Sequence, residues 1–202
     1  MSRAKNLVTA EWLIENIELQ NLKIGDATYF LPTHNRDAEA EFLKEHIRNA
    51  VRFDIDAIKD PNSDLPHMLP SPEQFETHMQ HLGFQNDDLI VVYDNSPFLS
   101  AARAWWLLRM FGHEKVFVLD GGLNRYKTLG GETEQGDGKT TQKSNFKSSN
   151  QMDTDVIKFD ELYKKVFSTE DIQILDARSY ARFSGKQAEP RVGLRSGHIP
   201  KS

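Results

Sequence analysis

The strongest constraint on the fold of this chain is the alternation of short apolar runs with helical patterns. The clearest run is Leu89–Tyr93 (LIVVY), which is followed by a helical pattern at residues 101–111 and a further apolar run at residues 115–119. Apolar runs of this length are typical of strands that are buried on both faces of a sheet. Strands that alternate with helices predict an α/β fold, a parallel sheet with helices on both faces.

Local patterns extend this prediction along the chain. Residues 27–31 and 51–55 are expected to be strands, and residues 39–46 and 123–129 to be helices. Thr9 is a candidate N-cap for a first helix that includes Leu13. Ser71, followed by Pro72 and by Gln74 at the third helical position, has the composition of a capping box.

The domain organisation follows from composition. We expect a first complete domain over residues 1–135 and a linker over residues 136–155, because residues 136–150 are polar, rich in Gly, Ser and Lys, and contain one core candidate, Phe146. Residues 156–202 are expected to form the beginning of a second α/β unit, with a helix at residues 156–167 and a buried strand at residues 172–176.

Charge and composition exclude several classes of protein. The 202 residues carry a formal net charge of −5, so there is no basic surface of the kind that binds nucleic acid. No apolar run is long enough to span a bilayer, and the N-terminal residues lack the pattern of a signal peptide, so we expect a cytoplasmic protein without membrane contact. The chain has no Cys, which excludes a disulfide scaffold, Cys-ligated metal and a thiol nucleophile within these residues.

Two further patterns favour structural roles. Residues 94–100 connect a strand to a helix start, where such folds bind anions, but the loop opens with Asp94, whose carboxylate would repel an anion. We therefore expect a structural loop in a non-catalytic domain. His78 and His81 have a spacing that could contact a metal, but no third ligand is identifiable, so no metal site is expected.

Arg182 and Arg191 are candidate ligand-binding residues in the second unit. Two guanidinium groups nine residues apart on a loop can fork a carboxylate, although spacing alone favours solvated surface arginines. A weak internal repeat is also present, since residues 45–50 (EHIRNA) match residues 197–202 (GHIPKS). If the two units are equivalent, the second unit should continue into a strand and then a strand–loop–helix segment.

Three long motifs resemble the two-domain rhodanese family of thiosulfate and 3-mercaptopyruvate sulfurtransferases. They begin at residues 51, 91 and 174, with the sequences VRFDIDAIKDPNSDLPHMLPSPEQF, VVYDNSPFLSAARAWWLLRMFGHEKVFVLDGGLNRY and ILDARSYARFSG, the last continuing to EPRVGLRSGHIP. The resemblance implies two tandem rhodanese-like α/β domains that share one active site. It also implies that a Cys in the C-terminal domain carries sulfur as a persulfide, and that Asp94 occupies the corresponding vacant position in the N-terminal domain.

The resemblance implies roles for four residues and no cofactor. Arg182 and Arg191 match the family's substrate-binding arginines, and the Arg in EPRVG favours the 3-mercaptopyruvate type. Asp56 and His67 match residues proposed to relay protons with a Ser in the Cys loop, although packing or loop capping is the alternative for His67. The implied partners are a small-molecule sulfur donor and a thiol or cyanide acceptor.

The end of the sequence departs from the family pattern, because Lys201 stands where the family has Gly after GHIP. We expect a chain truncated before the catalytic Cys loop, hence inactive alone, and completed by a C-terminal fragment or by self-association. The alternative hypothesis is a non-catalytic rhodanese-like module that binds an anion or a protein partner through the apolar face of residues 172–176.

Overall fold

The computed structural model of the chain describes residues 6–97, 99–139, 142–149, 156–169, 171–191 and 193–202. Two compact units are present. Unit 1 comprises residues 1–30 and 36–152, and unit 2 comprises residues 31–35 and 153–202. Among the described residues no helix combines the length and the apolar character needed to cross a membrane.

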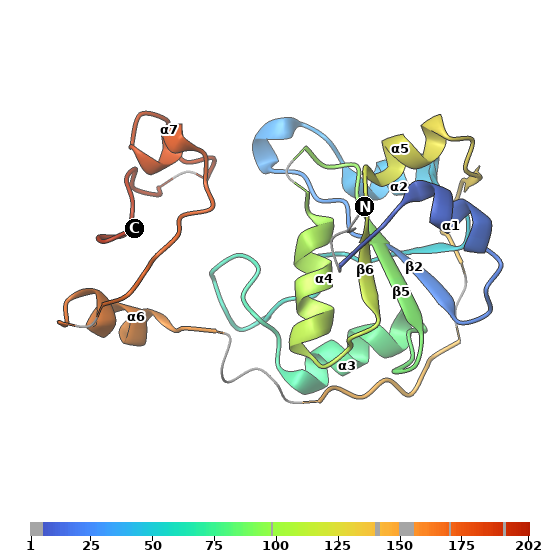
Figure 1. Ribbon diagram of the computed structural model, residues 1–202, viewed down its shortest axis with the longest axis horizontal. Coiled ribbons are helices and arrows are strands. Elements are labelled where there is room, and N and C mark those ends of the chain that lie inside the picture. The colour runs from blue at the N-terminus through green and yellow to red at the C-terminus, as the bar shows by residue number, and fades with distance from the viewer. Residues whose placement is uncertain (1–5, 98, 140–141, 150–155, 170, 192) are drawn as a thin grey trace. The chain divides into compact units, whose positions relative to one another are not determined.

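Unit 1 is built on a five-stranded sheet with the strand order β1-β6-β5-β2-β4 (Figure 1). Every pairing in this sheet is parallel, which confirms the predicted fold class. The strands are β1 (Leu7–Val8), β2 (Leu22–Asp26), β4 (Ala50–Arg52), β5 (Leu89–Tyr93) and β6 (Val116–Leu119). A second sheet pairs β3 (His46–Ile47) with β7 (Thr133–Glu134) in antiparallel register.

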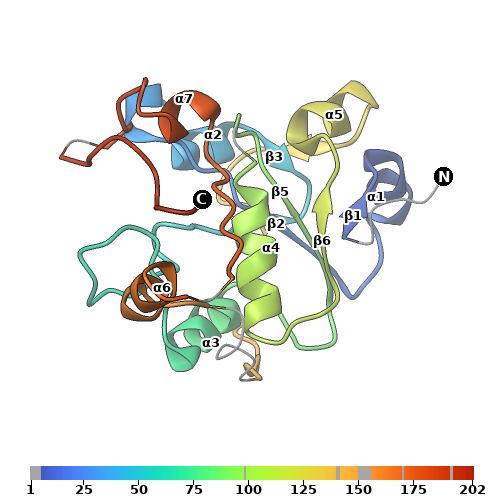
Figure 2. The same ribbon diagram turned by 60° about the vertical axis from the view of Figure 1, so that its left-hand side comes forward.

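Helices cover both faces of the five-stranded sheet. Helices α1 (Ala10–Asn16), α2 (Ala38–Lys44) and α5 (Gly122–Thr128) bury Leu13, Phe42 and Tyr126 in one cluster with Val91 and Tyr93 of β5. Helix α4 (Ala101–Met110) packs on β5 and β6 on the other face (Figures 1 and 2). Helix α3 (Pro72–His81) joins that layer, since Phe75 stacks on Phe111 just beyond α4.

The predicted helix starts are confirmed by their side-chain caps. The Ser71 hydroxyl accepts a hydrogen bond from the Gln74 backbone N–H at 3.3 Å, and the Gln74 side chain accepts one from the Ser71 N–H at 2.8 Å. This reciprocal pair is the capping box that the sequence predicted for α3. Thr9 caps α1 by accepting from the backbone N–H of Trp12 at 3.2 Å.

One predicted strand is displaced. The strand expected at residues 27–31 lies at β2, Leu22–Asp26, and residues 27–31 leave the sheet as loop. Lys23 and Gly25 interrupt the apolar run of β2, whereas residues 27–31 are mostly buried and imitate a strand.

The described part of the expected linker belongs to unit 1 and packs against the rest of it. We call residues 142–149 the strap. The Phe146 side chain is fully buried, and Gln80 of α3 donates to its backbone oxygen at 3.0 Å. The Ser144 N–H donates to the backbone oxygen of Gln80 at 3.0 Å, and Glu76 accepts from Ser148 N–H at 3.0 Å. The polar composition of the strap therefore serves hydrogen bonds to unit 1.

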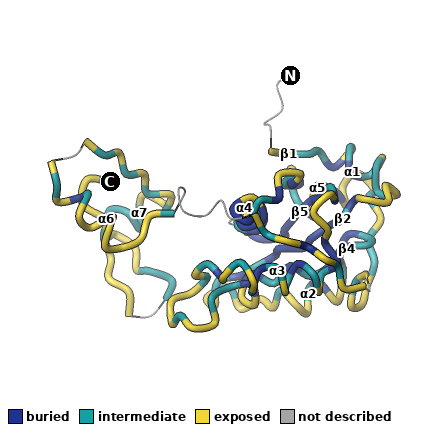
Figure 3. Tube along the Cα trace, turned by 90° about the horizontal axis from the view of Figure 1, so that it is seen from below, coloured by how far each residue is buried: buried dark blue, intermediate teal, exposed yellow. Residues whose placement is uncertain are grey.

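Unit 2 is small and largely exposed. It contains the 3₁₀ turn η1 (Pro32–His34) and two helices, α6 (Phe159–Val166) and α7 (Tyr180–Phe183). Residues 172–176, expected to be a buried strand, have no strand partner among the described residues, and Leu175 is 95% exposed. The prediction of burial is wrong for this segment because, in the described part of the chain, no strand pairs with it. Figure 3 shows the part of the chain around α6 and α7 mostly in the colours of exposed and intermediate residues.

Candidate functional site

Asp56 and His67, the two predicted relay residues, meet in the loop between β4 and α3. His67 Nε2 lies 2.8 Å from Asp56 Oδ1, and the His67 side chain is only 22% exposed. With the proton on Nε2, the imidazole donates to the carboxylate and its Nδ1 becomes the nitrogen that can accept a proton. In this geometry the Asp56 carboxylate can orient the His67 ring.

Buried side chains and a backbone hydrogen bond anchor the loop around this pair. Ile55 and Ile58 are buried beside Asp56, and the Asp60 N–H donates to the backbone oxygen of Met68 at 3.0 Å. His67 itself has a φ of 58°, in the left-handed region that residues with a β-carbon rarely adopt. A strained backbone next to a polar pair is typical of functional loops, because surrounding contacts must hold it.

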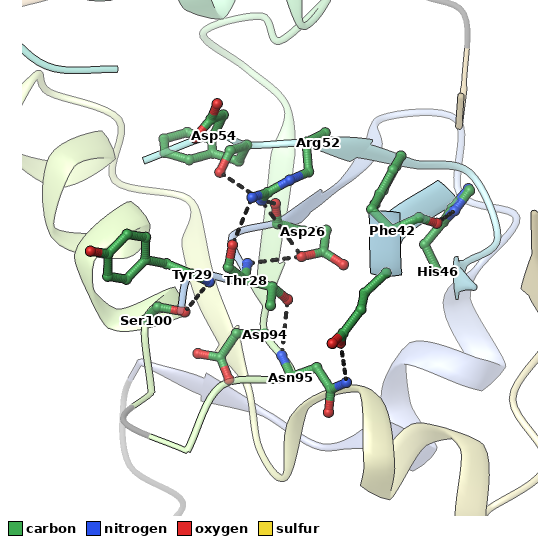
Figure 4. Close-up of polar contacts among 12 residues, drawn as sticks. Asp26, Thr28, Tyr29, Phe42, His46, Arg52, Asp54, Asp94, Asn95 and Ser100 are labelled. Atoms are coloured by element: carbon green, nitrogen blue, oxygen red, sulfur yellow. Dashed lines mark hydrogen bonds and ion pairs between the residues drawn. The ribbon is translucent and has the colours of Figure 1, made fainter. Parts of the chain in front are cut away.

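Asp94 lies inside the loop between β5 and α4 (Figure 4). Its Oδ2 accepts from the backbone N–H of Ala101 at 2.6 Å, and its Oδ1 accepts from that of Ser96 at 3.2 Å. Burial raises the pKa of the Asp94 carboxyl. The carboxylate therefore occupies the place at the start of α4 where such loops hold an anion, in agreement with the structural role expected for it.

Neighbouring polar residues fix this loop to the ends of the strands. The Asn95 N–H donates to the Thr28 hydroxyl at 3.0 Å, and Ser100 Oγ accepts from the Tyr29 N–H at 3.1 Å (Figure 4). Asp26, at the end of β2, accepts from the Thr28 N–H at 2.8 Å. The loop is thus held by β2 and its continuation as well as by its own carboxylate.

Arg182, one of the two predicted substrate arginines, is engaged by a carboxylate of its own unit. It lies on α7, where its Nε and Nη2 donate to Glu189 Oε2 at 3.1 and 2.5 Å. Glu189 also accepts from Arg178 at 2.8 Å, and the hydrogen bonds to Arg182 lower the pKa of the Glu189 carboxyl. Arg191 lies half-buried in the loop that follows. Any carboxylate ligand at Arg182 therefore meets a guanidinium that Glu189 already pairs.

The structure extends the internal repeat beyond the six residues seen in the sequence. His46 stacks on Phe42 with ring centroids 4.0 Å apart and its Nδ1 lies 2.7 Å from the Phe42 oxygen. His198 stacks on Phe183 at 4.1 Å and its Nδ1 lies 2.8 Å from the Phe183 oxygen. The end of α7 in unit 2 is therefore built like the end of α2 in unit 1.

A second repeated contact lies at the end of β2 and at residues 176–178 of unit 2. Asp26 accepts from the N–H of Thr28, and Asp176 accepts from the N–H of Arg178 at 2.9 Å. The dipeptide Asp-Ala, which occurs at both places, is a sequence signal that sequence reasoning missed. Residues 172–176 therefore correspond to β2, which in unit 1 lies between β4 and β5.

The backbone conformation at Lys201 also repeats one seen in unit 1. It has a φ of 69°, and Asn49, its counterpart in unit 1, has a φ of 66°. The left-handed region favours Gly and, among other residues, Asn. The expectation that position 201 favours glycine is therefore supported by its backbone geometry.

Other residues considered from the sequence have ordinary structural roles. His81 Nδ1 lies 2.7 Å from the backbone oxygen of Thr77, and burial lowers the pKa of His78. In the part of the chain that the structure describes, no three His, Cys, Asp or Glu side chains are grouped so as to hold a metal ion. Glu189, which pairs with Arg182, was not identified from the sequence. It could have been found from the motif EPRVG, in which it stands two positions before Arg191.

Comparison with known proteins agrees with this fold. The sequence model of the rhodanese-like domain family matches residues 9–129 of this chain. The chain is 40% identical to thiosulfate/3-mercaptopyruvate sulfurtransferase 1 of Arabidopsis thaliana over 222 residues, and 42% identical to 3-mercaptopyruvate sulfurtransferase of Escherichia coli over 194 residues. These alignments cover 100% and 96% of this chain, but 58% and 68% of the relatives.

A solved structure shows the same architecture. The crystal structure of SseA from Escherichia coli, which has the rhodanese fold, matches with a TM-score of 0.87 and 38% sequence identity. The match covers 98% of this chain and 73% of that one. The chain thus spans less than the full length of each relative compared.

Proposed function

The chain belongs to the rhodanese family, and we propose that it provides the N-terminal domain and the donor-binding arginines of a tandem-domain 3-mercaptopyruvate sulfurtransferase. The observation that carries the proposal is the 2.8 Å hydrogen bond between His67 and Asp56. A 2-oxo acid that loses sulfur leaves as an enolate, which needs a proton. A His oriented by an Asp supplies that proton more readily than solvent does.

The proposed reaction needs a Cys thiolate that these 202 residues do not contain. The thiolate attacks the sulfur of the donor, so that an S–S bond forms while the C–S bond breaks, and the electron pair of that bond goes to the pyruvate enolate. His67 Nδ1 first accepts, through a hydroxyl relay, the proton that the Cys thiol loses on becoming the thiolate. The same proton then passes from Nδ1 through the relay to the enolate, and pyruvate is released. A thiol or cyanide acceptor then removes the outer sulfur of the persulfide.

Arg182 and Arg191 bind the carboxylate of the donor in this proposal. A guanidinium presents paired N–H groups to a carboxylate, and Arg182 already uses that geometry on Glu189. The donor carboxylate therefore exchanges with the Glu189 carboxylate or shares Arg182 with it. No cofactor takes part, and we place the protein in the cytoplasm, which fractionation of cells that express the complete protein would test.

The test supplies the absent Cys loop. The 202-residue chain alone should form no persulfide and no thiocyanate. Joined to the C-terminal third of the Escherichia coli relative, the chain should turn over 3-mercaptopyruvate, and His67→Gln or Asp56→Asn should lower kcat by about 10²- to 10⁴-fold.

Thiosulfate is the matched control substrate, because its leaving group, sulfite, departs as a stable anion without protonation. Both variants should therefore affect turnover of thiosulfate much less. Equal losses with both donors would contradict the relay. Activity of the 202-residue chain alone would contradict the requirement for an added Cys.

The second candidate function is a non-catalytic module that binds a protein partner. The observation in its favour is the exposure of apolar side chains in unit 2, where Leu175 is 95% and Phe159 is 76% exposed. Apolar surface of this kind marks protein-binding sites. Concentration-dependent association in sedimentation velocity would support this module, and a monomer at all concentrations would count against it.

A further inference from the structure

The loop that carries His67 has few contacts of its own to fix the imidazole. Residues 61–69 are mostly exposed, and Leu65 and Met68 on either side of His67 are 62% and 44% exposed. The hydrogen bond to Asp56 cannot fix the ring alone, since the Asp56 side chain is itself 58% exposed. Besides the hydrogen bond from the Asp60 N–H to the Met68 oxygen, a group outside this loop holds the backbone at His67.

Helix α4 supplies such a group. Arg103 Nη2 donates to the backbone oxygen of His67 at 2.5 Å, across 36 positions of sequence. Tyr29 contacts the imidazole itself, with its ring edge-on to the imidazole ring at a centroid distance of 4.9 Å and an angle of 89°. Figure 2 shows α4 lying along β5 and β6, so the arginine is carried by a rigid element.

Arg103 is preorganised for this contact. Its guanidinium lies 4.6 Å from the ring centroid of Trp106, one turn further along the helix. Its Nε is buried without a hydrogen-bond partner in the described part of the chain, and burial lowers its pKa. An arginine that is half-buried with an unsatisfied donor is a costly way to stabilise a helix. Its position is better explained by what its Nη2 holds.

We propose that Arg103 is a positioning residue that fixes the His67 backbone, and thereby sets the imidazole toward Asp56. The inference rests on the proposed function for its biological meaning, but not for its test. Arg103 contacts neither the sulfur donor nor the acceptor in the proposed reaction. It acts through the carbonyl of His67, while Tyr29 limits the rotation of the ring.

The test reads the tautomer of His67 directly in the 202-residue chain. Long-range ¹H–¹⁵N correlation spectra distinguish the two neutral tautomers of each imidazole, and the signals of His67 are assigned by their loss in His67→Gln. The wild type should show one dominant tautomer, with the proton on Nε2. Arg103→Met should replace this by an average of the two tautomers, because the ring is no longer held against Asp56.

A matched control is available on the same helix. Arg109 also lies over a tryptophan, 5.5 Å from the Trp105 ring centroid, but it donates to the backbone oxygen of Glu114. Arg109→Met should leave the His67 tautomer unchanged. Arg103→Gln serves as a second variant, whose shorter side chain cannot reach the carbonyl, and it decides the question if Arg103→Met does not fold.

Two outcomes would overturn the inference. One is an unchanged tautomer in a folded Arg103 variant, with folding verified from the amide spectrum of unit 1. The other is an equal change in Arg109→Met, which would indicate a general effect on α4. Failure of the proposed function is a separate result, seen when His67→Gln leaves turnover of 3-mercaptopyruvate intact in the extended chain, whatever Arg103 does to the tautomer.

Discussion

At the scale of single residues, the turn at Asn49 shows how backbone conformation restricts side-chain choice. Asn49 has a φ of 66° between β3 and β4, and its N–H donates to Glu134 at 2.9 Å. Asn tolerates this region, whereas a β-branched residue does not. We expect Asn49→Val to lower the free energy of unfolding by about 1–2 kcal/mol, and Asn49→Gly to change it little. Urea denaturation measures both, and equal losses would contradict a backbone cause.

His113 makes the stability of unit 1 depend on pH. It is 1% exposed, and burial lowers its pKa from the ordinary value of 6.5. The unfolded chain therefore binds a proton at a pH where the folded chain does not. The contribution is fully present above pH 6.5 and is lost as the pH falls through the folded pKa.

The prediction for His113 concerns the slope of the free energy of unfolding against pH. Between about pH 7 and pH 5, the free energy of unfolding should fall more steeply for the wild type than for His113→Leu. His81→Gln, which changes an exposed histidine, should keep the slope of the wild type. Parallel curves for the wild type and His113→Leu would contradict the assignment.

At the scale of elements, the strap shows how one apolar residue anchors a polar segment, and Phe146 is the residue that the sequence analysis named as its core candidate. Phe146 is fully buried, with its ring centroid 6.0 Å from that of Phe75 and 6.1 Å from that of His113. Phe146→Ala should lower the free energy of unfolding of unit 1 by about 3–5 kcal/mol, since it empties an aromatic site. Lys147→Ala removes only an exposed ion pair with Glu76 and should cost less than about 1 kcal/mol.

Sequence patterns predicted the elements whose signal is local. The capping box at Ser71 and the apolar run of β5 contain their own cause, and both are confirmed. β2 was misplaced because its burial comes from β4 and β5, which lie 24 to 71 positions away in the chain. The meeting of His67 with Asp56 was expected from resemblance, whereas the contact with Arg103 depends on tertiary packing that no short pattern encodes.

At the scale of the whole molecule, the two units differ in how they bury apolar side chains. The sheet of unit 1 is covered on both faces, whereas Phe159, Tyr163, Phe167 and Leu175 of unit 2 are more than half exposed. Exposed apolar segments with few packed neighbours open readily. Limited trypsin digestion should therefore cut unit 2 first and leave a protected product that contains the strap. Early cleavage within residues 89–119, followed by loss of unit 1, would contradict this order.

The carboxylate of Asp94 affects whether the loop between β5 and α4 can bind an anion from solution. A charge tethered inside the loop is present at an effective concentration far above that of a dissolved ion. The loop thus carries its own counter-ion, and we expect sulfate or phosphate in the buffer to leave its amide signals unmoved.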